Sequence, residues 1–205
     1  MAALGVPRHA RQRLARTPQK RQHRRMTCFI ALLRAINVGK RQVPMAELRM
    51  LVTGLGYGDV QSHVASGNLL FSGEGSAADV ERTLDAAISE RFGFPVETMV
   101  RTADQWPLYV AANPFPRESE AAPNRVLMLL SKAPPTPDAA ARIAERAQAG
   151  EIVRAAGGAI WIYYADGVGR SKLSPVFIDR MIGSPATGRN ISTVRKLAAM
   201  AGVAA

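Results

Sequence analysis

The sequence predicts an α+β protein made of two ferredoxin-like halves with antiparallel or mixed sheets, and three observations lead to that class. Short apolar runs that suit strands alternate with apolar residues at helical spacing. The expected elements follow the order β-α-β-β-α-β in residues 26–112, which is the order of a split ferredoxin-like unit. They follow β-α-β-β-α in residues 125–205. Because no sequence repeat connects the halves, the duplication is inferred from element order alone.

The first half begins with a central strand. Residues 27–35 are nearly all apolar, which indicates a strand buried on both faces. Pro44 suits the first turn of a helix, and Ser76 with Asp79 forms a capping pattern before another. Periodicity and turn residues then predict helices from residues 44 and 76, strands at 60–65, 69–73 and 95–101, and a helix at 102–112.

The second half follows a segment rich in proline. Residues 113–124 hold three prolines and several polar residues, so we expect a linker there. The pattern then predicts a strand at 126–130, a helix after 136–138, and a hairpin around Gly157 and Gly158. Ser174 is expected to cap a short helix that ends at Ile182. Asn190 or Ser192 is expected to cap the last helix.

Composition is that of an ordinary globular protein, with 47% hydrophobic and 21% charged residues. No apolar run approaches the roughly 18 residues of a membrane span, so we expect a soluble, cytoplasmic protein that does not contact a membrane.

Cys28 is the single cysteine, which excludes an intramolecular disulfide and a zinc site built on paired cysteines. We expect Cys28 to fill space in the first strand. The oligomeric state stays open.

The net charge of +11 is concentrated at the N-terminus. Residues 1–25 carry eight basic and no acidic side chains, whereas the remaining 19 basic and 16 acidic residues leave +3. This segment has no apolar periodicity and is expected to be disordered. We favour a start codon assigned upstream of the true one at Met26, ahead of a basic arm for nucleic acid and a transit peptide. Nucleic-acid binding is expected only through this segment, and should weaken steeply with salt.

The sequence offers few residues for catalysis. His63 is the one histidine after residue 25, and a lone histidine in a strand is more often structural than catalytic. Without a second histidine or a nucleophile beside it, no catalytic triad or zinc set is expected. Gly54, Gly56 and Gly58 follow a helix, not a strand, which is the wrong context for a dinucleotide-binding loop. We therefore expect no bound metal and no cofactor.

Three polar islands interrupt the apolar pattern. The first follows the first strand, the second is a turn, and the third lies near the C-terminus, where residues 170–196 carry a local charge of +5. Arginine, lysine and helix N-termini are common tools for binding phosphate or carboxylate. We therefore expect a small anionic ligand in a polar cleft between the halves. Its candidate binding residues are Arg34, Asn37, Gly39, Ser66, Asn68, Arg170, Lys172, Arg189 and Asn190.

Other interpretations of the islands stay open. Ser66 and Asn68 suit a simple turn, Asn190 suits a helix cap, and basic residues suit a solvated face. Arg34 argues most strongly for a site, because a charge that ends a buried strand needs a partner. One alternative function is an enzyme of phosphoryl or nucleotidyl chemistry that uses the same arginines and lysines, with a metal brought by the substrate. Another is a structural or oligomeric module without a ligand.

Several motifs together resemble the bacterial family called domain of unknown function 1697. They are residues 33–39, 44–49, 66–68, 100–102, 113–115, 169–173, 187–190 and 193–197, in the family's order. The resemblance implies a duplicated ferredoxin-like architecture, a start at Met26 and no established activity. The chain departs from the family in a shorter loop at residues 39–42, and in Ile191, where an aromatic residue is usual. If that aromatic residue holds a ligand, the site here is weakened.

Overall fold

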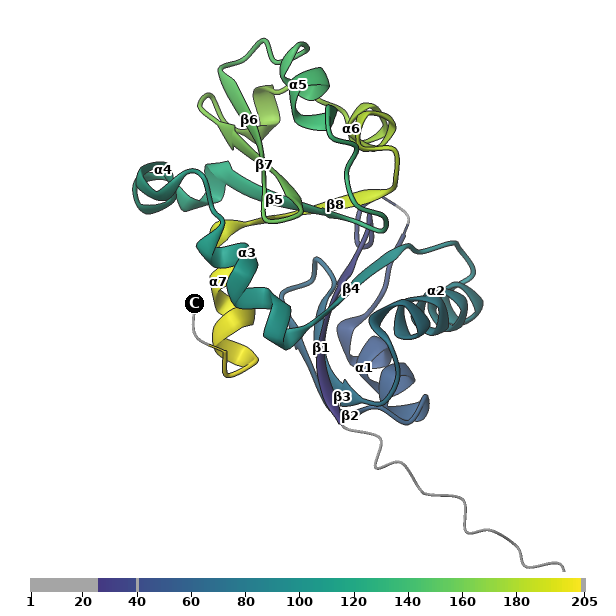
Figure 1. The fold of residues 1–205 in the computed structure, drawn as a ribbon. Coiled ribbons are helices and arrows are strands. Elements are labelled where there is room, and N and C mark those ends of the chain that lie inside the picture. Colours follow the sequence, from purple (N-terminus) through teal and green to yellow (C-terminus); the bar gives the residue numbers. More distant parts are fainter. Residues whose placement is uncertain (1–25, 40, 204–205) are drawn as a thin grey trace, which may run out of the picture.

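The computed structural model describes residues 26–39 and 41–203, so the expectations for residues 1–25 lie outside the described part. Within it the strands form two four-stranded antiparallel sheets, with the orders β2-β3-β1-β4 and β6-β7-β5-β8 (Figure 1). The first sheet contains β1 (Thr27–Leu33), β2 (Gly58–His63), β3 (Asn68–Gly73) and β4 (Thr98–Thr102). The second contains β5 (Val126–Ser131), β6 (Glu151–Ala156), β7 (Ala159–Tyr164) and β8 (Ala186–Asn190).

Helices cover both sheets. They are α1 (Met45–Gly54), α2 (Ala77–Phe92), α3 (Trp106–Ala111), α4 (Pro116–Ala121), α5 (Ala139–Ala144), α6 (Pro175–Ile182) and α7 (Ile191–Met200). Short 3₁₀ turns lie at Ala103–Gln105, Pro123–Arg125 and Val168–Arg170. We call residues 26–112 the first half and residues 125–203 the second half.

The α+β class predicted from the sequence is confirmed. Leaving aside α3, α4, α7 and the 3₁₀ turns, each half has the element order β-α-β-β-α-β and the same strand order, with its first strand between its third and fourth. The fourth strand of the second half, β8, was not expected, because its sequence Ala-Thr-Gly-Arg-Asn has no apolar alternation. A duplication of one ferredoxin-like unit stays a prediction.

The segment expected as a linker carries structure of its own. Residues 113–124 contain α4 and most of a 3₁₀ turn, with Pro116 and Pro123 at their first positions. Phe115 is buried and packs against Tyr163, with ring centroids 6.1 Å apart. The segment is therefore fixed to the second sheet by an aromatic contact.

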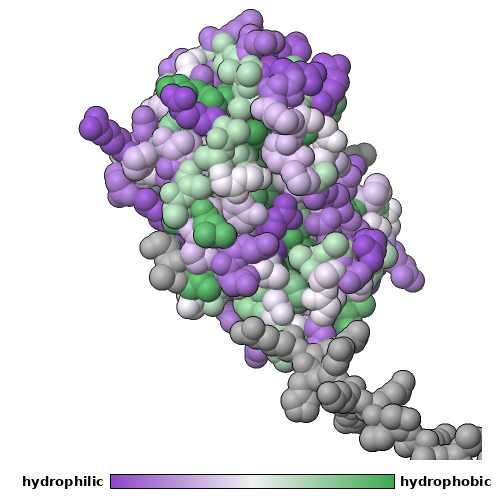
Figure 2. Space-filling model, in the orientation of Figure 1, coloured by the Kyte–Doolittle hydropathy of each residue, from purple (hydrophilic) through white to green (hydrophobic). Residues whose placement is uncertain are grey.

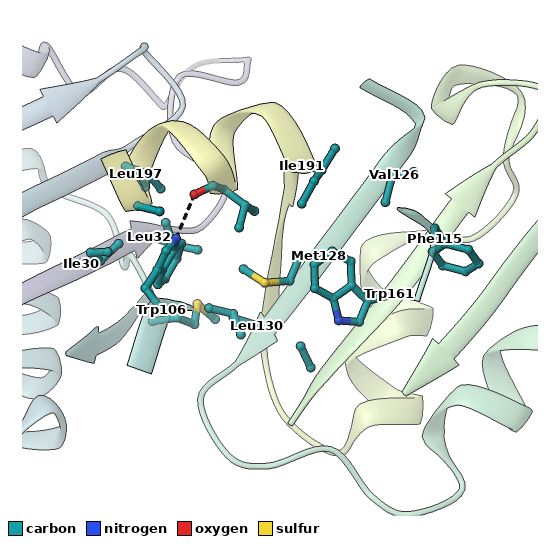
Figure 3. Close-up of a cluster of buried hydrophobic side chains, with 14 of the residues drawn as sticks. Ile30, Leu32, Trp106, Phe115, Val126, Met128, Leu130, Trp161, Ile191 and Leu197 are labelled. Atoms are coloured by element: carbon teal, nitrogen blue, oxygen red, sulfur yellow. Dashed lines mark hydrogen bonds between the residues drawn. The ribbon is translucent and has the colours of Figure 1, made fainter. Parts of the chain in front are cut away.

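One hydrophobic cluster joins the halves. Figure 3 shows Ile30 and Leu32 of β1 close to Trp106 and Leu197, while Met128 and Trp161 of the second sheet lie in the same cluster. The Trp106 indole donates a hydrogen bond of 2.9 Å to the Val194 carbonyl on α7. Helices α3 and α7 thus lie against the first sheet while sharing a core with the second.

The opposite faces of the sheets have their own cores. Phe29, Ala31 and Leu33 point from β1 into a cluster with α1 and α2, so β1 is buried on both faces as its composition predicted. A third cluster packs α5 and α6 against β5 and β7. Figure 1 shows these helices on the outer faces of the two sheets.

The surface is mixed in character. On the face drawn in Figure 2, hydrophobic residues are interspersed among hydrophilic ones. Within the described residues, no helix has the length and apolar character needed to cross a membrane.

Cys28 is half-buried on β1, where burial and then the Asp59 carboxylate raise the pKa of its thiol. A raised pKa keeps a thiol protonated and unreactive, which fits a structural role.

Candidate ligand-binding cleft

Arg34 follows β1 and reaches the second half. Its Nη2 donates to Asp179 Oδ2 at 2.6 Å, and its Nε donates to the Ala186 carbonyl at 2.9 Å. Its Nη1 lies 3.5 Å from Glu97 Oε2. Because Asp179 also accepts a hydrogen bond from the Ala186 N–H, the guanidinium holds the start of β8 against the end of β1. The charge at the end of this strand therefore has two carboxylate partners.

Asn37 shapes the loop that follows Arg34. Its side-chain N–H groups donate to the Val43 and Ala65 carbonyls at 3.1 and 2.6 Å, and its Oδ1 accepts from the Val43 N–H at 2.8 Å. Asn37 itself adopts a φ of +55°, a conformation that asparagine tolerates better than most residues. Gly39 is exposed, has a φ of +57° and lies outside the cleft described below. Both residues have structural roles in this loop.

The turn from Ser66 to Asn68 packs tightly on β1. A Cβ at Gly67 would lie 2.6 Å from the Ile36 side chain and 2.8 Å from that of Leu33, and its φ is +78°. Only glycine fits such an approach in that conformation. Asn68 is fully buried and donates to Ser66 Oγ at 3.1 Å and to the His63 carbonyl at 2.9 Å.

Arg189 of β8 is the centre of the site. The five N–H groups of its guanidinium make six hydrogen bonds within the described residues, because three acceptors share the two hydrogens of Nη2, and every acceptor is a neutral oxygen. The acceptors are Asn68 Oδ1, Thr187 Oγ1 and the carbonyls of Leu33, Ser66, Gly67 and Gly188. Burial lowers the pKa of Arg189 to about 10, which leaves it protonated at neutral pH. The residue therefore brings a positive charge into the interior, and no described carboxylate forms an ion pair with it.

Arg170 and Lys172 lie apart from this network. Both are exposed, on the segment between β7 and α6. Ser171 between them donates to the Glu151 carboxylate and accepts from the Leu173 N–H. Burial alone would raise the pKa of Glu151, but hydrogen bonds from Ser171 and the Ala149 N–H hold it below its ordinary value. Ser171 thus fixes the segment, while its two basic neighbours extend into solvent.

A cleft separates the loop after β1 from the second sheet. It measures about 560 Å³, within the range of small-molecule sites. Arg34, Ala35 and Val38 line one side, and the second half lines the other with Leu127, Leu129, Tyr164, Val168, Ser171, Leu173, Ser174, Pro175, Ile178, Asp179, Ala186, Thr187 and Gly188. Burial and then the charge of Glu151 raise the pKa of Tyr164 to about 12, so its phenol is neutral.

A smaller hollow adjoins the cleft. It measures about 280 Å³ and is lined by Ser66, Asn124, Leu127, Val168, Gly188, Arg189, Asn190 and Thr193. Three of these residues, Leu127, Val168 and Gly188, also line the cleft. We call the two together the groove. Asn190 lies at its edge as the N-cap of α7, where its Oδ1 accepts from the Thr193 N–H at 2.9 Å.

Two hydroxyl groups on the groove accept hydrogen bonds from this network. Thr187 Oγ1 accepts 2.8 Å from Arg189 Nη1, and Ser66 Oγ accepts from the Asn68 amide, whose oxygen itself accepts from Arg189. Each hydroxyl has one hydrogen and two lone pairs. Within the described residues neither one donates a hydrogen bond, so both can donate to a ligand.

Two of the described non-glycine residues with a positive φ lie on segments that border the groove. Ala35, which lines the cleft, has a φ of +51°, and so does Val64 in the turn that precedes Ser66. A β-branched residue in this region is a genuine outlier. Such strain persists only where surrounding contacts impose it, and it is common at binding sites.

The structure brings together five of the nine predicted site residues. Arg34, Ser66, Arg189 and Asn190 line the groove, and Asn68 supports it from beneath. Asn37, Gly39, Arg170 and Lys172 do not line it. Sequence reasoning did not select Asp179, Thr187 or Tyr164 as binding residues, although Thr187 lies in the third polar island, because their positions depend on how the halves pack. Residues 170–196 contain one acidic residue, Asp179, among six basic ones. That isolated carboxylate is the signal in the sequence that could have identified a partner for Arg34.

Comparison with known proteins places the chain in a family. The profile of the family described as "Protein of unknown function (DUF1697)" matches residues 26–161. The chain belongs to this family. Comparison with curated proteins finds no match. Among solved structures, a conserved bacterial protein, SP0830 from Streptococcus pneumoniae, is 24% identical, with a TM-score of 0.69 over 87% of this chain and 99% of that one. That likeness supports the fold.

Ile191, where the resemblance led us to expect an aromatic residue, is a core residue in this chain. Its side chain is fully buried in the cluster that joins the halves and does not line the groove (Figure 3). The expectation that a side chain at this position holds a ligand therefore finds no support in the described contacts.

Metal and catalytic groups are sparse in the described part of the protein. No group of three histidine, cysteine or acidic side chains in that part is arranged to hold a metal ion. His63 is half-buried on β2 and outside the groove. Asp179 is a carboxylate in the cleft, but hydrogen bonds from Arg34 and the Ala186 N–H occupy both its oxygens. The arrangement suits binding better than proton transfer.

Proposed function

We propose that this protein binds a small anionic ligand in the groove between its halves. The observation that carries the proposal is the buried Arg189, whose charge meets only neutral oxygens beneath the hydroxyls of Ser66 and Thr187. A buried charge acts through a medium of low dielectric constant, so it attracts an anion more strongly than an exposed one does. Phosphate and carboxylate both accept hydrogen bonds from hydroxyl groups.

The test is thermal unfolding of the full chain with inorganic phosphate, nucleotides, sugar phosphates and simple carboxylates, with and without Mg²⁺. A ligand at about 100 times its Kd adds about 2.7 kcal/mol to the free energy of unfolding. For a protein of this size that shift corresponds to roughly 5–10 °C in Tm. A stabilising anion supports the proposal, and the absence of a shift across the panel overturns it.

Matched variants locate the site. Ser66→Ala and Thr187→Val each remove one hydroxyl from the groove, and we expect each to weaken binding about tenfold, as for a lost hydrogen bond to a charged group. Thr53→Val removes a hydroxyl from an exposed position on α1, and should leave binding unchanged. Equal affinity in all three variants would place the anion elsewhere.

Catalysis of phosphoryl or nucleotidyl transfer is the second candidate. Asp179 is the observation that favours it, because it places a carboxylate in the cleft. A base must reach the proton that it removes, and Arg34 with the Ala186 N–H holds this carboxylate in place. Turnover of a stabilising ligand that is lost in Asp179→Asn, without loss of binding, would establish this role.

A further inference from the structure

The two parts of the groove differ in chemistry. Five of the eight residues that line the hollow are polar or charged, among them Ser66, Asn124 and Arg189. The cleft is lined largely by apolar side chains, including Leu127, Leu129, Leu173, Ile178 and the ring of Tyr164. Leu127, Val168 and Gly188 line both parts, and Thr187, which precedes Gly188 and accepts from Arg189, lies where the two parts meet.

We propose that the ligand is amphipathic, with its anionic group in the hollow and an apolar body, a short alkyl chain or an aromatic ring, in the cleft. This inference rests on the proposed function and names the class of ligand. Pockets of this kind are largely apolar, with a few polar groups that fix orientation. An apolar body would displace water from the leucines and isoleucine of the cleft, which is favourable in proportion to the area covered.

Charge determines which way the ligand lies. Asp179 in the cleft carries negative charge, and its partner Arg34 offsets that charge at 2.6 Å. The hollow has no carboxylate among its lining residues, and it lies over Arg189, which has no carboxylate partner in the described part of the chain. An anionic group is therefore more stable in the hollow, and the apolar body extends past Val168 into the cleft.

Exposed apolar side chains at the mouth of the cleft support the inference. Val38 on the loop after β1 is 57% exposed, and Val168 on the opposite side is 46% exposed. Both line the cleft, although they belong to different halves. An apolar body between them would remove both from water.

Titration calorimetry on the full chain tests the ligand class. The probes are inorganic phosphate, butyl phosphate, hexyl phosphate, ribose 5-phosphate and hexanol. We expect affinity to rise along the alkyl phosphates by up to about fourfold for each buried methylene. Ribose 5-phosphate should bind about as well as phosphate, and hexanol more weakly than hexyl phosphate.

A matched pair of variants tests the position of the apolar body. Val38→Thr replaces a methyl group that lines the cleft but not the hollow with a hydroxyl, and should lower the affinity for hexyl phosphate severalfold without changing that for phosphate. Val176→Thr makes the same change at a site that is 76% exposed and outside the groove, so neither affinity should change. Equal effects of the two variants would overturn the placement.

The outcomes separate the two proposals. If phosphate and ribose 5-phosphate bind but the alkyl chain adds no affinity, the amphipathic class is wrong and the proposed function stands. If none of the phosphates binds and no simple carboxylate stabilises the chain, both proposals fail. Cosedimentation with phosphatidylcholine vesicles that contain phosphatidic acid, but not with phosphatidylcholine alone, would identify a lipid headgroup as the source. That result would overturn a free small molecule as the ligand.

Discussion

The Arg189 side chain both connects the two halves by hydrogen bonds and places a positive charge beneath the groove. Four of its acceptors belong to the first half. The guanidinium gives these oxygens the hydrogen bonds that water would make to them if they were exposed. A lysine could not do this, because its ammonium has three donors and lacks the planar fork. The sequence placed Arg189 in a candidate site, but its role as a buried hydrogen-bond centre depends on contacts across the interface.

Thr98 on β4 gives the first prediction at this scale. Its hydroxyl is the one described buried side-chain group without a hydrogen-bond partner, and the residue is fully buried. Thr98→Val replaces that hydroxyl with a methyl group of similar size. We expect the free energy of unfolding in urea to rise by about 1 kcal/mol, because an unsatisfied buried hydroxyl is destabilising.

Thr187→Val is the control for this substitution. Thr187 is also buried, but its hydroxyl accepts a hydrogen bond from Arg189. The same chemical change should therefore lower the free energy of unfolding by about 1–2 kcal/mol. If both variants are destabilised alike, an ordered water satisfies the Thr98 hydroxyl and the prediction is wrong.

At the scale of elements, local signals predicted much of the fold. The caps of α2, α6 and α7 lie where the sequence indicated, with Ser76, Ser174 and Asn190 each accepting from a backbone N–H of the first turn. Each cap could be predicted because the capping side chain and the N–H that it accepts from lie only three residues apart in the sequence. Strand β8 was missed because its sequence does not alternate between apolar and polar residues. Its pairing with β5 defines it as a strand, and that pairing is visible only in the structure. The structured segment at 113–124 was missed because prolines open helices as well as interrupt them.

The connection from β7 to α6 carries the second prediction. Glu151 on β6 accepts from Ser171 on this connection, and these hydrogen bonds hold its pKa below the ordinary value. A carboxyl whose pKa is lowered on folding stabilises the protein above its unfolded-state pKa and loses that effect as pH falls. We expect Glu151→Gln to lower the free energy of unfolding by about 1–2 kcal/mol at pH 7.

The pH dependence distinguishes this effect from a packing defect. The difference between wild type and Glu151→Gln should shrink as pH falls from about 5 through the lowered pKa of Glu151, because the wild-type carboxyl then becomes protonated. Urea unfolding at several pH values measures it. Glu145→Gln, at an exposed position after α5, should show no such difference. A deficit that stays constant with pH would assign the effect to packing alone.

At the scale of the whole molecule, charged side chains cross the interface in both directions. Arg34 and Arg101 reach from the first half to Asp179 and the Ser131 carbonyl, while Arg189 and Lys132 reach back. These partners lie 30 to 156 residues apart along the chain. Composition and periodicity describe neighbours within a few residues, so no local pattern could identify such pairs. The sequence therefore singled out Arg34 and Arg189 as candidates without identifying the partners that hold them across the interface.

Lys132 carries the last prediction. Its ammonium lies 3.2 Å from Glu81 Oε1 and also contacts Asp85, and both carboxylates accept from backbone N–H groups of β4. Burial would lower the pKa of Lys132, but these two carboxylates raise it above its ordinary value. Lys132→Met leaves the carboxylates without their cation. We expect a loss of about 1–2 kcal/mol, or roughly 2–8 °C in Tm.

Calorimetry should show this loss as a shift of a single transition. The cluster of Trp106, Met128 and Ile191 is shared by the halves, so neither can unfold without exposing the apolar surface of the other. The calorimetric and van't Hoff enthalpies should therefore agree in wild type and in Lys132→Met. Lys196→Met, at an exposed position on α7, should leave Tm unchanged. Two resolved transitions would mean that the halves fold independently, and a groove built from both would then lack the rigidity that tight binding of a small ligand requires.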